Sequence, residues 1–113
     1  MSATERAKGV RGEQEVASVL RAFGLPCDRT VQNSGFYVRG DLTGVDGYHV
    51  EVKRQETLRL PLWMRQAQEE AGDAVPVVTW RQNRGEWYAA LPLRDLARLL
   101  ALANLEGGTN GDS

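Results

Sequence analysis

Hydrophobic residues recur at intervals of three or four in three stretches of the chain, the spacing of a helix with one apolar face. Helices are expected over residues 5–23, 61–71 and 93–105. Gly24 and Gly72 follow the first two stretches as stop signals. In the third, Leu93, Leu96, Leu100 and Ala103 form one stripe. This stripe is expected to pack on a sheet.

Shorter apolar stretches between these helices predict strands. Strands are expected over residues 25–33, 36–43, 48–53, 74–80 and 87–91. The clearest alternation puts Tyr48, Val50 and Val52 on one face. The polar residues at 49, 51 and 53 then share the other face. The preceding segment, Gly44-Val45-Asp46-Gly47, is a hairpin-turn signal.

The order helix, three strands, helix, two strands, helix predicts an α/β fold, α-β-β-β-α-β-β-α, with helices on both faces of a central mixed five-stranded sheet. The chain has no repeat and no internal linker. We therefore expect a single domain over residues 1–105, followed by a disordered polar tail over residues 106–113.

Composition agrees with one folded domain and excludes several classes of protein. The 113 residues are 42% hydrophobic and 26% charged. No apolar run is long enough for a membrane helix, and the first residues lack the apolar core of a secretory signal. One cysteine excludes an internal disulfide, and one cysteine with one histidine argues against a closed zinc site. A cytoplasmic protein without a membrane partner is expected.

The net charge of −1 limits how the chain could bind nucleic acid. Fourteen basic residues, twelve of them Arg and two Lys, face fifteen acidic ones. Binding to DNA would therefore need a localised basic surface. Basic residues that flank the candidate site in sequence could line such a track, although each could equally be ordinary solubilising charge: Lys8, Arg11, Arg39, Arg54 and Arg59.

The strongest candidate for a catalytic group consists of Asp41, Glu51 and Lys53. The hairpin turn brings Asp41 near Glu51, and Lys53 shares the strand face of Glu51. Two converging carboxylates repel each other unless a cation lies between them, and hard oxygen ligands suit Mg²⁺ or Mn²⁺. A metal ion with an ammonium group beside it suits phosphodiester hydrolysis. The alternative, for these three residues alone, is a solvated strand face with an ion pair.

Four short motifs stand in order around this group: Lys8-Gly9-Val10-Arg11-Gly12-Glu13, Asn33-Ser34-Gly35, Gly40-Asp41-Leu42 with Glu51-Val52-Lys53, and Trp63-Met64-Arg65-Gln66-Ala67. With them the chain, over roughly residues 6–100, resembles the PD-(D/E)XK nuclease superfamily. Within it, the chain is similar to the archaeal-type Holliday junction resolvases and their phage relatives. It departs from them at Gln14, where resolvases usually carry Arg, and in not being strongly basic.

The resemblance implies a restriction-endonuclease-like fold and a Mg²⁺- or Mn²⁺-dependent endodeoxyribonuclease, expected to be a junction-resolving homodimer acting on branched DNA. It implies catalytic roles for Glu13, Asp41, Glu51, Lys53 and Gln66. The implied metal ligands are Asp41, Glu51, Glu13 and the backbone carbonyl of Val52. The expected DNA contacts are Lys8, Arg11, Ser34, Arg39, Arg54 and Arg59. The protein would act in the cytoplasm, in that of a host cell if it is encoded by a phage.

Other interpretations of these residues stay open. Glu13 and Gln66 could be solvated helix residues. His49 shares the strand face of Glu51, so it could be a general base or a structural neighbour. The three tryptophans could stack on bases or pack in the core. At the level of function, the alternatives are a repair or restriction-type nuclease for flaps, single strands or nicked duplex, and an inactive DNA-binding module.

Overall fold

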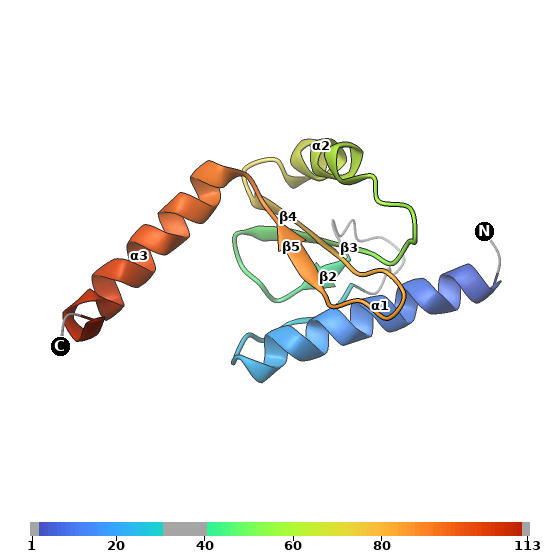
Figure 1. The fold of residues 1–113 in the computed structure, drawn as a ribbon, viewed down its shortest axis with the longest axis horizontal. Coiled ribbons are helices and arrows are strands. Elements are labelled where there is room, and N and C mark those ends of the chain that lie inside the picture. The colour runs from blue at the N-terminus through green and yellow to red at the C-terminus, as the bar shows by residue number, and fades with distance from the viewer. Residues whose placement is uncertain (1–2, 31–40, 112–113) are drawn as a thin grey trace, which may run out of the picture.

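The computed structural model describes residues 3–30 and 41–111, and their side chains up to Glu106. The elements, in chain order, are α1 (Ala3–Ala22), β1 (Asp28–Arg29), β2 (Leu42–Thr43), β3 (Tyr48–Lys53), α2 (Leu60–Ala71), β4 (Val75–Trp80), β5 (Tyr88–Ala90) and α3 (Leu93–Gly111). This α-β-β-β-α-β-β-α order confirms the sequence prediction. Figure 1 shows the strands lying between α1 and α2.

A three-stranded sheet, in the order β3-β4-β5, forms the centre of the molecule. Strands β3 and β4 are parallel, with Glu51 opposite Val78, and β5 pairs antiparallel with β4. Parallel neighbours need a crossover connection, which α2 provides. Pro61, near the first turn of α2, has the fixed φ that suits a helix start, and Gly72 follows the last turn with φ +59°.

Each face of this sheet is covered by one helix. On one face, Val50 and Val52 pack with Val16 and Ala17 of α1. On the other face, Val78 packs under Trp63 and Ala67 of α2. The alternation in residues 48–53 therefore turns the side chains at 49, 51 and 53 toward the α2 side. The three tryptophans pack in or against the core. Trp63 of α2 is buried, Trp80 packs against that side of the core, and Trp87 packs against the α1 side.

The expected five-stranded sheet is not formed. The described strands fall into this sheet and a separate antiparallel pair, β1–β2, of two residues each. The chain approaches β3 at Asp41, whose backbone N–H donates to the carbonyl of Val50 at 2.9 Å. It then turns away through Gly44 and Gly47, which have φ of +88° and +84°. Among the described strands, β2 therefore pairs with β1 and β3 pairs with β4.

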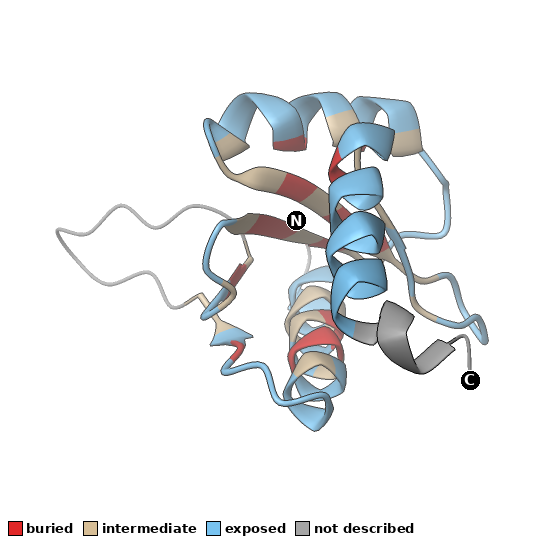
Figure 2. Cartoon of the chain, turned by 90° about the vertical axis from the view of Figure 1, so that its left-hand side faces the viewer, coloured by how far each residue is buried: buried red, intermediate tan, exposed pale blue. Residues whose placement is uncertain are grey.

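Helix α3 corrects a second expectation. It begins at Leu93 as predicted but extends to Gly111 instead of ending at residue 105. Its leucine stripe does not pack on the sheet: Leu93 is 78% exposed and Leu100 is 60% exposed. Both sheet faces are already covered, and the two residues between β5 and α3 are too few to lead the helix back. Figure 1 shows α3 leading away from the strands, and Figure 2 shows that most of its described surface is exposed.

None of the described helices is long and apolar enough to cross a lipid bilayer.

Candidate metal and nucleic-acid site

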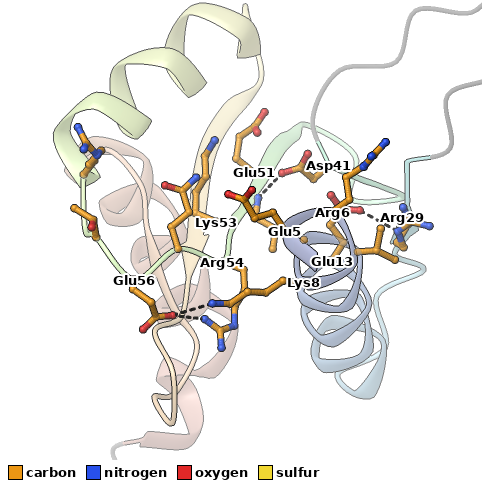
Figure 3. A pocket seen from close by; sticks show the side chains of 16 residues that line it. Glu5, Arg6, Lys8, Glu13, Arg29, Asp41, Glu51, Lys53, Arg54 and Glu56 are labelled. Atoms are coloured by element: carbon orange, nitrogen blue, oxygen red, sulfur yellow. Dashed lines mark hydrogen bonds and ion pairs between the residues drawn. The ribbon is translucent and has the colours of Figure 1, made fainter. Parts of the chain in front are cut away.

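A pocket of about 720 Å³ opens where β3 emerges between α1 and the segment leading to α2. Glu51, Val52 and Lys53 of β3 line it, together with Asp41 and Glu13. These five residues come from α1, the segment before β2, and β3. Figure 3 shows the side chains of Glu13, Asp41, Glu51 and Lys53 around one opening. All the predicted metal ligands therefore share one pocket with the predicted lysine.

Asp41 is held in this pocket by β3 itself. Its Oδ2 accepts a hydrogen bond from the backbone N–H of Val52 at 2.6 Å. The N–H and C=O of a strand residue point to the same edge, so the carbonyl of Val52 also faces the edge where Asp41 lies. This orientation suits the metal-ligand role expected of the Val52 carbonyl.

Glu13 reaches the pocket from α1 and is paired with Arg29 of β1. The Nε–H of Arg29 donates to Glu13 Oε1 at 2.9 Å, and both side chains are partly buried. Burial raises the pKa of Glu13, the hydrogen bond from Arg29 opposes that rise, and the charge of Asp41 adds to it. The sequence interpretation missed Arg29, whose only signal was its place in a predicted strand.

Glu51 is the most perturbed carboxyl of the pocket. Burial, followed by the negative charge of Asp41 and contact with Glu70 of α2, raises its pKa to about 8, while Lys53 acts in the opposite direction. A carboxyl among carboxyls holds a proton or a cation more readily than an isolated one. Hard oxygen donors that converge in this way fit a divalent ion of the Mg²⁺ or Mn²⁺ class.

Basic side chains surround the acidic centre. Lys8 and Arg59, which are predicted to contact DNA, line the pocket, and so does Arg6, which the sequence interpretation did not single out. Lys8 Nζ lies 3.3 Å from Glu56 Oε2. The pocket wall is therefore mixed in charge, with cations around a carboxylate centre.

Arg54 also lines the pocket, but its side chain is only 9% exposed. Its guanidinium donates to Glu56 at 2.8 Å, to Asn83 at 2.8 Å and to the carbonyl of Arg81 at 3.2 Å. The backbone N–H of Asn83 and then the side chains of Arg54 and Lys8 lower the pKa of Glu56. The contacts of Arg54 thus join the loop after β3 to the loop after β4.

The remaining predicted residues lie elsewhere. Arg11 lines a neighbouring pocket of about 280 Å³ on α1, together with Glu15 and Arg81. Gln66 is exposed on α2 and is not among the residues that line the acidic pocket. Ser34 and Arg39 lie outside the described residues.

A family model described as "phage putative PDDEXK endonuclease" matches residues 4–105. The matched range includes every residue of the acidic pocket. No curated protein and no solved structure matches the chain.

Proposed function

This chain belongs to the phage PDDEXK endonuclease family, and on that premise we propose that its acidic pocket hydrolyses phosphodiester bonds of branched DNA with the help of Mg²⁺ or Mn²⁺. The observation that carries this proposal is the convergence of Glu13, Asp41, Glu51 and Lys53 on one pocket. Family membership makes the chain a nuclease. The metal, the substrate and the residue roles are the proposal.

Asp41, Glu51, Glu13 and the carbonyl of Val52 would hold the ion. When bound, the ion would offset charge on the phosphate and acidify a water molecule. Lys53 extends from the strand that carries Glu51, so its ammonium group meets the same phosphate. There it stabilises the negative charge that grows in the transition state. Arg29 positions Glu13 through the 2.9 Å hydrogen bond and limits its freedom to turn away.

DNA reaches the pocket along its basic rim. Lys8 and Arg59 contact phosphates beside the scissile bond, and Arg11 extends this track along α1. Ser34 and Arg39 stay predicted DNA contacts, because they lie outside the described residues. Arg54 was predicted as a contact too, but its three internal hydrogen bonds favour a role in holding the rim in shape.

We propose a four-way junction as the substrate and a homodimer as the active form. A junction offers two strands for symmetric cutting, and a two-fold dimer offers two pockets to match them. The exposed leucines of α3 supply apolar surface for such an interface.

Cleavage assays on four-way junction, flap, duplex and single-stranded DNA test this proposal, each with Mg²⁺ and with EDTA. We expect Mg²⁺-dependent cleavage of the junction, and loss of that cleavage in Asp41→Asn with the fold retained. Cleavage in EDTA equal to that in Mg²⁺ would contradict the site assignment. Preferential cleavage of flaps or single strands would contradict the junction assignment and favour a repair-type nuclease.

A further inference from the structure

Glu51 takes part in a second cluster of ligand-type atoms, under α2. The ring nitrogen Nε2 of His49 lies 2.6 Å from Glu51 Oε2 and 3.5 Å from Glu70 Oε1. One ligand atom from each residue lies within 4.8 Å of the other two. His49 and Glu70 are not among the residues that line the acidic pocket, so this cluster extends beyond the proposed nuclease site.

The fold fixes this cluster from two elements. His49 and Glu51 are two residues apart on β3 and therefore share its α2-facing side. Glu70 comes from the last turn of α2, the helix that covers this face. The side chain of His49 is 3% exposed and that of Glu51 is 13% exposed, whereas Glu70 is 56% exposed. Two ligands are thus shielded from water, and the third is accessible from the surface.

A buried imidazole distinguishes the cluster from an ordinary acidic patch. Burying a polar ring costs free energy unless it gains a strong partner, and His49 is directed at two carboxylates. Those two carboxyl groups also face each other, so a proton or a cation between them is needed to offset their mutual repulsion. A divalent cation coordinated by all three side chains would neutralise both carboxylates and bind the buried imidazole as well. Zn²⁺ and Mn²⁺ accept a mixture of imidazole and carboxylate ligands, whereas Mg²⁺ favours oxygen ligands and water.

We propose that His49, Glu51 and Glu70 form a second divalent-metal site, which binds a transition-metal ion of the Zn²⁺ or Mn²⁺ class. The site requires neither Asp41 nor nuclease activity, although it shares Glu51 with the proposed nuclease centre. Glu51 thereby links the two sites through one carboxyl group.

His49 is the single histidine of the chain, so its imidazole gives one unambiguous NMR signal in untagged protein. The test is titration with Zn²⁺ alone, without DNA, followed by calorimetry and by that signal. We expect one Zn²⁺ per chain and a shift of the His49 resonance, in the wild type and in Asp41→Asn alike. Glu70→Gln should weaken binding at least tenfold. Glu69→Gln, which changes the exposed neighbour on α2, should leave binding unchanged.

Zn²⁺ binding that leaves the His49 resonance unmoved, as binding at the buried Cys27 would, overturns the proposal. Equal affinity of Glu70→Gln and the wild type overturns it as well. Because the titration contains no DNA, its result is separate from that of the cleavage assay. Loss of cleavage in Asp41→Asn together with absent Zn²⁺ binding in the wild type would leave the nuclease proposal intact and remove this one.

Discussion

The carboxylate of Asp41 accepts a 2.6 Å hydrogen bond from the backbone N–H of Val52, the residue between Glu51 and Lys53. This contact fixes the spacing between a carboxylate from one segment and the two functional side chains of another. An amide at position 41 retains an oxygen acceptor for this hydrogen bond. The contact therefore explains why Asp41→Asn is expected to keep the pocket in shape while removing a charged ligand.

Glu51 should make the stability of the metal-free protein depend on pH. Its pKa is about 8 in the folded protein, against 4.5 as the ordinary value, so the folded state binds the extra proton between these values. The free energy of unfolding should therefore fall as pH rises from about 4.5 to 8, by roughly 1–2 kcal/mol after allowance for solvent screening. Glu51→Gln should lose this slope and be the more stable protein above pH 8. Urea unfolding in EDTA at several pH values measures the effect, and parallel curves for both proteins would contradict it.

Lys53→Ala should impair cleavage far more than binding, because its charge is needed mainly as the phosphate gains charge in the transition state. We expect cleavage to fall at least about 100-fold, or about 2.7 kcal/mol of barrier, with the dissociation constant for DNA changed less than about threefold. Lys8→Ala, at the other lysine, is the matched control and should weaken binding first. Single-turnover cleavage and fluorescence anisotropy separate the two effects. If Lys53→Ala lowered DNA affinity as much as it lowered the cleavage rate, Lys53 would act in DNA binding alone.

Arg59 and Arg54 should respond differently to replacement by Ala, although both line the pocket. Arg59 is exposed, so its loss should weaken binding to all DNA forms and lower the salt slope by about one unit, if it contacts one phosphate. Arg54→Ala removes three internal hydrogen bonds and should cost about 2 kcal/mol of stability. Salt titrations of DNA binding and thermal unfolding of both variants provide the comparison. A salt slope that falls only in Arg54→Ala would show that Arg54, and not Arg59, contacts the phosphate.

Gly44 should be the least replaceable residue of the turn before β3. A Cβ there would clash with the backbone carbonyl oxygen of Pro26, and φ is +88°. Gly47 has a similar φ of +84°, but a Cβ there meets nothing within 4 Å. Gly47→Ala should therefore cost only the left-handed strain of about 1–2 kcal/mol, whereas Gly44→Ala should cost clearly more or prevent folding. Thermal unfolding checks this order, and equal losses would show that the contact with Pro26 relaxes freely.

Helix α3 should mediate self-association through its exposed leucines. Leu100→Glu puts a charge into the stripe and should convert a dimer into a monomer. Ala101→Glu adds the same charge on a different side of α3 and should leave the dimer intact. Light scattering distinguishes these states, since one chain has a mass of 12.5 kDa. A wild-type particle of that mass at working concentrations would remove the dimer proposal.

The sequence predicted local features better than the way they combine. The alternation of residues 48–53 predicted β3 with its bounds and faces, because each residue contributes its own burial preference. The joint position of Asp41 and Glu51 was also predicted, since a short turn leaves few alternatives. The prediction that α3 packs on the sheet was wrong, because leucine periodicity identifies an apolar face but not the surface that covers it. The pairing of Glu13 with Arg29 and the approach of Glu70 to His49 depend on long-range packing, which no local pattern encodes.

The parallel pairing of β3 with β4 also determines when the acidic pocket can fold during synthesis of the chain. Every proposed ligand of the acidic pocket is translated before β4, whose residues Val75–Trp80 form the partner of β3. Trp87 and Arg81, which anchor α1 through Glu15, emerge later still. Folding of the pocket must therefore wait for the second half of the chain, because non-local strand pairs form only when both partners are present. A ribosome stalled before residue 75 would display all the ligands of the pocket without the frame that holds them together.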